Sequence, residues 1–333
     1  MNKKSLFLVI LMALSFVGCS SNISNMTNNN DNFVETTSKE SYERNEKKSF
    51  DELFVYDTSM PKVLHNKHIF SNIDDYPNVD GSTALIPYMQ KLLNSIFEID
   101  EDKTEDYIVC SKTSKAWENL TNKKTDLLIV GEVPESAKEE IVLNQTPILY
   151  SQVRNEGLVF IVNKDNPINN ISKEDLIRIY TGEITNWKEL GGEDKEIKAF
   201  QRNESSGSQT NFIKVLMKDI EPKVSQPEYY IGDMGYLVDA IASFDGENNA
   251  IGYSVYYYAN VMYTKDNLKL LAIDGVLPSN ETIGNGTYPL LTKSYVAIRA
   301  DENESSNTYK LYDYIRSNLG IEDLVSCGYV PVK

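Results

Sequence analysis

Short apolar runs that alternate with amphipathic segments constrain the fold of this chain more than any other feature of its sequence. Residues 126–130 (DLLIV) and 158–163 (LVFIVN) are almost wholly apolar, as is typical of strands buried on both faces of a sheet. Around these runs, apolar residues recur at helical spacing. Because 41% of the 333 residues are apolar, the chain is able to bury two ordinary cores. The alternation predicts α/β layers with a mostly parallel sheet.

Capping residues mark the ends of the predicted helices. One helix is expected after the turn at 80–83 (DGST), another between Ser172 and Gly182, and a last one that ends at Gly320. Ser172 and Asp175 have the spacing of a capping box. The apolar residues at helical spacing are Leu85, Met89, Leu92, Leu93 and Ile96 in the first helix and Tyr309, Tyr312, Ile315 and Leu319 in the last. We find no internal repeat and no glycine pattern of a nucleotide-binding loop.

The N-terminus has the pattern of an export signal. Lys3 and Lys4 precede an apolar stretch, residues 6–17, that is too short to span a bilayer. The FVGCSS sequence that ends this region resembles the bacterial lipobox, whose cysteine is diacylated and becomes the first residue of the mature protein. This resemblance implies a signal peptide over residues 1–19 and an extracytoplasmic protein that Cys19 anchors to the cell membrane. An ordinary cleaved signal is the alternative.

Residues 20–52 are rich in Asn, Ser, Thr and charged residues and nearly free of large apolar side chains. They bury too little surface to offset the entropy cost of ordering, so we expect a disordered tether. The whole chain has a formal net charge of −16, which argues against nucleic-acid binding because that function needs a basic face. The acidic residues are spread along the chain and indicate a solvated surface.

Three separate loops carry hydroxyl groups in front of predicted helices. They are residues 80–83 (DGST), 111–114 (SKTS) and 205–208 (SSGS). A helix N-terminus offers unpaired N–H groups and a positive dipole end, to which hydroxyls add neutral donors. Gly207 allows close backbone approach, and Arg202 offers a planar fork suited to an oxyanion. Each loop alone is compatible with ordinary capping, but together they predict an anion site at the carboxyl edge of the sheet.

Longer motifs in the same region resemble the phosphate-binding proteins of bacterial phosphate ABC transporters. Residues 180–192 (YTGEITNWKELGG) and 200–212 (FQRNESSGSQTNF) are similar to consecutive motifs of that family. DGSTAL at 80–85 resembles its first ligand loop, and residues 250–253 (AIGY) and 271–290 resemble later segments. The motifs occur in the family's order, and the resemblance covers most of the chain beyond the tether.

This resemblance implies a type II periplasmic-binding-protein-like fold, an α/β protein whose two lobes close on one anion in the cleft between them. Each lobe is expected to have a mostly parallel sheet flanked by helices. The expected boundaries are 53–156 for the first part of lobe 1, 157–255 for lobe 2 and 256–333 for the return to lobe 1. The implied function is capture of inorganic phosphate by a monomer, without a cofactor, a metal or catalysis, and delivery of phosphate to an ABC permease.

The ligand residues that the resemblance implies come from both lobes. They are Ser82, Thr83 and Ser111 from lobe 1, and Arg202, Ser206, Gly207 and Ser208 from lobe 2. The second loop lacks the glycines usual in the family, so Thr113 or Ser114 is an alternative to Ser111. Ser208 stands where threonine is commoner, and the hydroxyl donor is retained.

Glu132 is the expected determinant of anion choice. Many members of the family have an acidic residue or an arginine after the strand that corresponds to 126–130, and Glu132 takes that place after a one-residue gap. Phosphate near pH 7 keeps a proton, whereas sulfate does not. A carboxylate accepts a hydrogen bond from that proton and repels an anion that lacks one. If Glu132 points into the cleft, the site should prefer phosphate.

Other functions remain open at this level. Another oxyanion or a small carboxylate bound by Arg202 would keep the fold and change the ligand, and a sensor lipoprotein would bind without transport. A Ser-His-Asp hydrolase would need His65 or His68 as its base, but both lie outside the three serine loops. As a metal pair they lack a nearby carboxylate or cysteine at ligand spacing. Cys110 and Cys327 are compatible with two thiols or with one disulfide.

Overall fold

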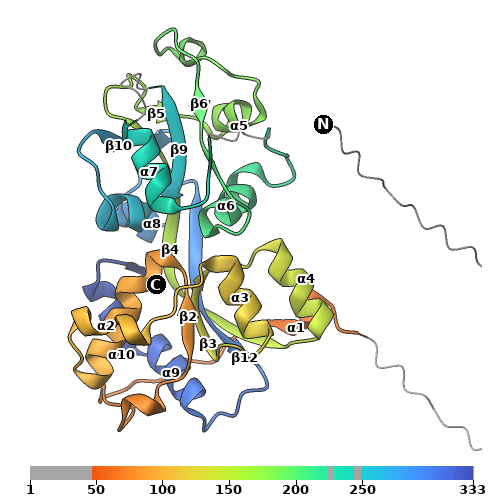
Figure 1. The fold of residues 1–333 in the computed structure, drawn as a ribbon, viewed down its shortest axis with the longest axis vertical. Helices are drawn as coiled ribbons and strands as arrows, with labels where there is room; N and C mark the ends of the chain where they lie inside the picture. The colour runs from red at the N-terminus through yellow and green to blue at the C-terminus, as the bar shows by residue number, and fades with distance from the viewer. Residues whose placement is uncertain (1–46, 224–228, 244–248, 333) are drawn as a thin grey trace, which may run out of the picture. The chain divides into compact units, whose positions relative to one another are not determined.

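The computed structural model describes residues 47–223, 229–243 and 249–332, and Figure 1 shows their fold. The expected signal peptide, Cys19 and the tether up to residue 46 lie outside these residues. The expected tether ended at residue 52, but its last three residues belong to a helix, α1 (Phe50–Leu53). This helix buries Leu53. In the part of the chain that the structure describes, no helix is both long and apolar enough to span a membrane.

Two strands connect two lobes. β4 (Ile148–Asn163) pairs with β12 (Leu291–Arg299) in antiparallel register, from Ile148 opposite Arg299 to Gly157 opposite Leu291. Figure 1 shows β4 passing from the lower group of elements to the upper group. We call the lower group lobe 1, residues 47–156 and 291–332, and the upper group lobe 2, residues 157–290.

Lobe 1 contains a sheet in the order β2–β3–β12–β4, with β1 paired along β4. Its remaining elements are β1 (Phe54–Tyr56), β2 (Val79–Gly81), α2 (Ile86–Phe97), α3 (Thr113–Thr121), β3 (Leu127–Gly131), α4 (Glu135–Asn144), α9 (Asn307–Arg316), α10 (Asn318–Ser326) and β13 (Val330–Pro331), with 3₁₀ turns at Ile73–Asp75, Thr83–Leu85, Glu101–Lys103 and Glu105–Tyr107. Leu127 and Ile298 belong to one apolar cluster, and Leu128 and Ala297 belong to another. Neighbouring residues on a strand point to opposite faces, so the sheet is covered on both sides.

Lobe 2 extends the same sheet through β4–β9–β6, with β10 along the end of β4. Two small sheets, β11–β5 and β7–β8, complete it. Its elements are β5 (Asn170–Ile171), α5 (Lys173–Thr181), β6 (Lys198–Ala199), β7 (Gln201–Arg202), α6 (Gly207–Asn211), β8 (Tyr230–Ile231), α7 (Met234–Ser243), β9 (Ala250–Val255), β10 (Leu268–Leu270), β11 (Ala272–Ile273) and α8 (Asn280–Gly284), with a 3₁₀ turn at Trp187–Leu190 and π-helical turns at Phe212–Met217 and Tyr258–Met262.

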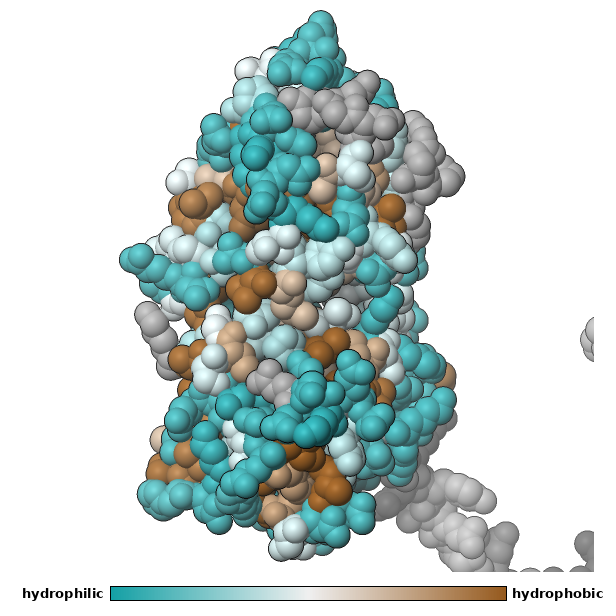
Figure 2. All heavy atoms as spheres, turned by 60° about the vertical axis from the view of Figure 1, so that its left-hand side comes forward, coloured by the Kyte–Doolittle hydropathy of each residue, from teal (hydrophilic) through white to brown (hydrophobic). Residues whose placement is uncertain are grey.

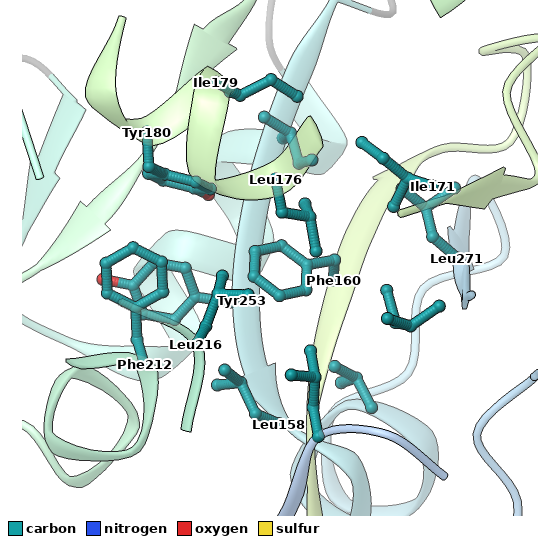
Figure 3. Close-up of a cluster of buried hydrophobic side chains, with 14 of the residues drawn as sticks. Leu158, Phe160, Ile171, Leu176, Ile179, Tyr180, Phe212, Leu216, Tyr253 and Leu271 are labelled. Carbon is teal, nitrogen blue, oxygen red and sulfur yellow. The ribbon is translucent and has the colours of Figure 1, made fainter. Parts of the chain in front are cut away.

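Aromatic packing holds α6 against the sheet of lobe 2. The rings of Phe212 and Tyr253 are stacked, with centroids 4.4 Å apart and an interplanar angle of 3°. Figure 3 shows these rings with Phe160 and Tyr180 in a cluster of buried side chains. The Tyr253 hydroxyl also accepts a hydrogen bond from the backbone N–H of Arg202 at 3.1 Å. The core of lobe 2 therefore positions both the end of α6 and the end of β7.

The predicted helices are confirmed with one difference. α2 and α5 lie where predicted, and the Ser172 hydroxyl accepts a hydrogen bond from the Asp175 N–H at 3.0 Å. The helix expected to end at Gly320 instead ends at Arg316, and α10 continues across Gly320. The Ser317 side chain caps this new helix through the Gly320 N–H, and a Cβ at position 320 would overlap backbone carbonyl oxygens. Glycine is needed there for close packing and not to end a helix.

Two expectations about topology are corrected. The sheets are mixed and not mostly parallel, because β4 is antiparallel to both β9 and β12. The chain also returns to lobe 1 at about residue 291 and not at 256. β10 pairs with the end of β4, and Leu271 and Tyr288 lie in the core of lobe 2.

Two cysteines lie in the part of the chain that the structure describes. No disulfide joins Cys110 and Cys327, so both are thiols, which is one of the two states that the sequence allowed. On the face shown in Figure 2, hydrophilic residues cover most of the described surface and apolar residues form small groups. This distribution agrees with a solvated exterior.

Candidate functional site

A cavity of about 50 Å³ lies where the two lobes meet. Its polar lining residues are Ser82, Thr83, Lys112, Thr113, Arg154, Glu156, Arg202, Ser206, Ser208, Asn211, Asp233, Lys293 and Ser294, and the backbone of Gly131 and Gly207 also contributes. The loops that follow β2 and β3 reach it from lobe 1, and the start of α6 reaches it from lobe 2. Six of the eight predicted ligand residues are therefore brought together, and Ser111 and Glu132 are not.

Arg202 is the most buried cation of the cavity apart from Arg154, with 3% of its surface exposed. Its Nε donates to the carbonyl oxygen of Ile231 at 3.1 Å, and one terminal nitrogen donates to the Ser208 hydroxyl at 3.2 Å. The other donates to the Gly232 carbonyl oxygen at 3.4 Å. Burial lowers the pKa of Arg202, yet a guanidinium stays protonated at neutral pH.

The acceptors that hold the Arg202 guanidinium are all neutral. In the described ranges, no carboxylate lies within ion-pair distance of it, and the nearby Asp233 pairs with Lys112 at 3.5 Å. A buried charge without a counter-charge is costly. The Arg202 side chain therefore presents to the cavity a positive charge that no described carboxylate pairs with directly, although Asp233 attracts it from farther away.

Gly207 lies where the α6 backbone approaches lobe 1 closely. Ser206 is the N-cap residue of α6, and its hydroxyl lies 3.0 Å from the Ser208 hydroxyl. A Cβ at position 207 would overlap the Thr113 hydroxyl of lobe 1. Only glycine lets the α6 backbone reach this position.

Hydroxyl groups form the lobe 1 side of the cavity. The Ser82 hydroxyl lies 3.0 Å from the Thr113 hydroxyl and accepts a hydrogen bond from the Gly131 N–H at 3.2 Å. β2 and β3 are parallel neighbours, so the loops after them meet at one edge of the sheet. Thr83 also lines the cavity, and its hydroxyl accepts a hydrogen bond from the Cys110 thiol at 3.7 Å.

Ser111 shapes its loop and does not line the cavity. Its N–H donates to an Asp80 carboxylate oxygen at 2.8 Å, and its hydroxyl accepts a hydrogen bond from the Asn119 side chain at 3.2 Å. Thr113, one of the two alternatives in that loop, lines the cavity instead. The expectation for Ser111 is therefore corrected.

Glu132 also differs from expectation. Its carboxylate binds the Lys214 ammonium of lobe 2 at 2.5 Å and accepts a hydrogen bond from the Tyr295 hydroxyl at 3.1 Å. Gly131 lines the cavity, and Glu132 follows it at the end of a strand, where successive side chains point to opposite sides. Alignment through a one-residue gap thus placed the carboxylate on the wrong side of the backbone.

A buried ion pair on β4 was missed from the sequence. One terminal nitrogen of Arg154 lies 2.7 Å from a Glu156 carboxylate oxygen, and Arg154 Nε donates to the Ser294 hydroxyl of β12 at 3.0 Å. The other Glu156 oxygen accepts from the N–H groups of Gly157 and Tyr257. A signal was present, since two opposite charges at i and i+2 share one face of a strand. These residues lie at the cavity, where the strands that connect the lobes run side by side.

The histidines do not belong to this site. His65 and His68 do not line the cavity, and His68 Nδ1 lies 2.8 Å from the Ile96 carbonyl oxygen. Among residues 47–223, 229–243 and 249–332, no group of His, Cys, Asp or Glu side chains is arranged to hold a metal ion.

Comparison with known proteins gives consistent matches. A family model described as a PBP superfamily domain matches residues 71–315. The phosphate-binding protein PstS of Bacillus subtilis strain 168 is 28% identical over 255 residues, which covers 76% of this chain and 80% of the relative. PstS of Borreliella burgdorferi is 24% identical over 261 residues, covering 77% and 90%.

Solved structures show the same fold. A putative phosphate ABC transporter substrate-binding protein from Clostridium perfringens, with bound phosphate, matches with a TM-score of 0.60 at 22% identity, covering 77% of this chain and 98% of that chain. An ABC-type phosphate transport receptor from Vibrio cholerae matches with a TM-score of 0.58 at 21% identity, covering 76% and 98%. The predicted two-lobed type II fold and the resemblance read from the motifs are both confirmed.

Proposed function

This chain belongs to the PBP superfamily, whose domain model spans residues 71–315, and we propose that it captures inorganic phosphate in the interlobe cavity and passes it to an ABC transporter. The relatives named above match about three quarters of this chain, and both are named as phosphate-binding proteins. This similarity supports phosphate as the ligand. The cavity supplies the chemistry that such a ligand needs.

The observation that carries the proposal is the buried guanidinium of Arg202, which has neutral acceptors and no paired carboxylate in the described residues. An oxyanion placed in the cavity supplies a directly paired negative charge, which Asp233 does not. The hydroxyls of Ser82, Thr83, Thr113, Ser206 and Ser208 supply neutral donors in place of the hydration shell of the ion. Capture of this kind needs no covalent step.

Two carboxylates at the cavity favour an anion that keeps a proton. Glu156 and Asp233 both line it. Burial acts to raise the pKa of Asp233, but the Gly235 N–H and the Lys112 ammonium outweigh burial and lower that pKa, so Asp233 is charged at neutral pH. Each carboxylate is paired with a cation, Glu156 with Arg154 and Asp233 with Lys112, so the choice of anion depends on hydrogen bonding more than on repulsion. A carboxylate oxygen accepts a hydrogen bond from the hydroxyl of singly protonated phosphate, which sulfate lacks. This arrangement replaces the selectivity that was expected from Glu132.

Calorimetric titration of the purified protein with phosphate, arsenate, sulfate and small carboxylates tests the ligand. Phosphate and arsenate should bind, and sulfate should compete poorly. Tighter binding of sulfate or of a carboxylate would replace phosphate by that ligand, and recovery of no bound anion would leave only a sensor or an interaction role.

We also propose the cellular setting that the N-terminal sequence indicates. The mature protein is an extracytoplasmic monomer, is diacylated at Cys19 and is tethered to the cell membrane. Mass spectrometry of the N-terminal peptide measures the lipid, and Cys19→Ala should release the protein from membranes. Co-purification of permease subunits measures the partnership.

Catalysis is not part of the proposed function. The relatives are named for binding, and both histidines lie away from the cavity. Phosphatase and esterase assays should show no turnover above background. Activity that is lost on replacing His65 or His68 would contradict this.

A further inference from the structure

The Glu132–Lys214 ion pair joins the two lobes without touching the cavity. Glu132 follows β3 in lobe 1, and Lys214 lies in the π-helical turn Phe212–Met217 of lobe 2. Glu132 is 6% exposed, so its carboxylate has lost most of its water. The ammonium that compensates this carboxylate comes from the opposite lobe, with Nζ 2.5 Å from Oε2. The burial of one group is thus tied to the position of the other lobe.

We propose that this pair is an interlobe latch, which stabilises the closed arrangement of the lobes and so strengthens binding of whichever anion occupies the cavity. This inference rests on the proposed function. Glu132 and Lys214 are positioning residues, because neither lines the cavity. Glu132 therefore affects the affinity for the anion without accepting a hydrogen bond from the anion's proton.

The exposure of the two side chains explains why closing gains free energy. When the lobes separate, Lys214 leaves and water returns to the Glu132 carboxylate. On closing, the carboxylate loses that water and gains the ammonium and its charge-assisted hydrogen bond. The Lys214 side chain stays 49% exposed, so it loses little hydration in return. The Tyr295 hydroxyl donates to the other carboxylate oxygen and comes from lobe 1, so this hydrogen bond does not depend on the position of lobe 2.

A second interlobe pair provides the contrast. Lys112 of lobe 1 and Asp233 of lobe 2 are 3.5 Å apart, but their side chains are 48% and 47% exposed. Water screens such a pair, and its contribution is small. Both residues also line the cavity, so their replacement would mix effects on closure with effects on the ligand. The latch is best tested at Lys214.

The two halves of the latch should respond differently to replacement. Lys214→Met leaves the Glu132 carboxylate buried and uncompensated, so phosphate affinity should fall about tenfold. Glu132→Gln removes the charge and keeps an oxygen for Tyr295, so the loss should be only about threefold. The double variant should bind better than Lys214→Met alone, and Lys214→Arg should keep wild-type affinity.

The experiment combines calorimetry with small-angle scattering of the purified protein. Phosphate and sulfate are titrated into the wild type and each variant, and the radius of gyration is measured without ligand. Lys188→Met serves as the control, because Lys188 pairs with Asp194 at 2.9 Å within lobe 2 and both are largely exposed. The latch requires weaker binding of both anions by Lys214→Met at an unchanged phosphate-to-sulfate ratio, together with a larger radius, while the control matches the wild type.

Three results would overturn the latch: unchanged affinity and radius in Lys214→Met, an equal effect in Lys188→Met, or better sulfate competition in Glu132→Gln. The last would return Glu132 to a role in reading the phosphate proton. If the wild type binds no phosphate, the proposed function fails separately. The radii of the ligand-free proteins then decide alone, since a latch makes the wild type more compact than Lys214→Met.

Discussion

Lobe 1 lines the cavity mainly with hydroxyl groups from loops, whereas lobe 2 brings the buried guanidinium of Arg202. Lobe 1 also brings cations to the cavity, but Arg154 is paired with Glu156, Lys112 is half-exposed and engaged with Asp233, and Lys293 is exposed. Arg202 is buried, and its position is set by the Tyr253 hydroxyl and by two carbonyl oxygens. The contrast indicates that lobe 2 carries the electrostatic attraction and that lobe 1 completes the donor shell on closing. Three replacements test this division.

Phe212→Ala should have the largest effect, because it removes the ring that stacks on Tyr253 directly after the end of α6. Loss of a fully buried aromatic ring should lower the free energy of unfolding by about 3–5 kcal/mol, measured by urea denaturation. Phe50→Ala, at a half-buried residue of lobe 1, is the control and should cost much less. A similar small cost at both positions would show that lobe 2 does not depend on this stack.

Arg202→Ala should weaken phosphate binding at least tenfold, since it removes a charge-assisted interaction in a site shielded from water. Arg202→Lys should fall between alanine and the wild type, because an ammonium lacks the planar fork. Calorimetry measures both, with Arg178→Ala on the exposed side of α5 as the matched loss of an arginine. Unchanged affinity in Arg202→Ala would remove the basis for assigning the charge to lobe 2.

Thr113→Ala should weaken phosphate binding about fivefold, the cost of one neutral hydrogen bond, and Ser111→Ala should change it less than twofold. The two hydroxyls lie in the same loop, so each controls for the other. Titration of both variants decides which of them belongs to the donor shell. A larger effect at Ser111 would restore the residue first expected from the family resemblance.

Helix positions and most site residues were predictable because their signals are local. Ser172 and Asp175 indicate a helix start within four residues. The hydroxyl groups before α6 are likewise neighbours in the sequence, at residues 205–208. The first half of β4 was not predicted, because Arg154 and Glu156 interrupt its apolar pattern. Their burial depends on an ion pair and on backbone N–H groups of Gly157 and Tyr257, which only the folded chain brings together.

The misplacement of Glu132 has a different cause. A shift of one residue at the end of a strand exchanges the two sides of the backbone, so Gly131 lines the cavity and Glu132 faces Lys214. The return of the chain at residue 291 was not predicted for another reason. Nothing local distinguishes a strand that stays within lobe 2, such as β10, from one that crosses between lobes. The first error is thus local to the end of β3, and the second concerns pairing between strands that lie far apart in the chain.

The cavity and the connection between the lobes share three residues, namely Arg154, Glu156 and Ser294. They lie on β4 and β12, the strands through which the lobes are joined. A substitution that changes the flexibility of these two strands therefore also changes side chains that line the anion cavity. Anyone converting the protein into an optical phosphate reporter should therefore attach dyes to the outer helices and leave these two strands alone, because selection for a larger signal there would also select for a different affinity.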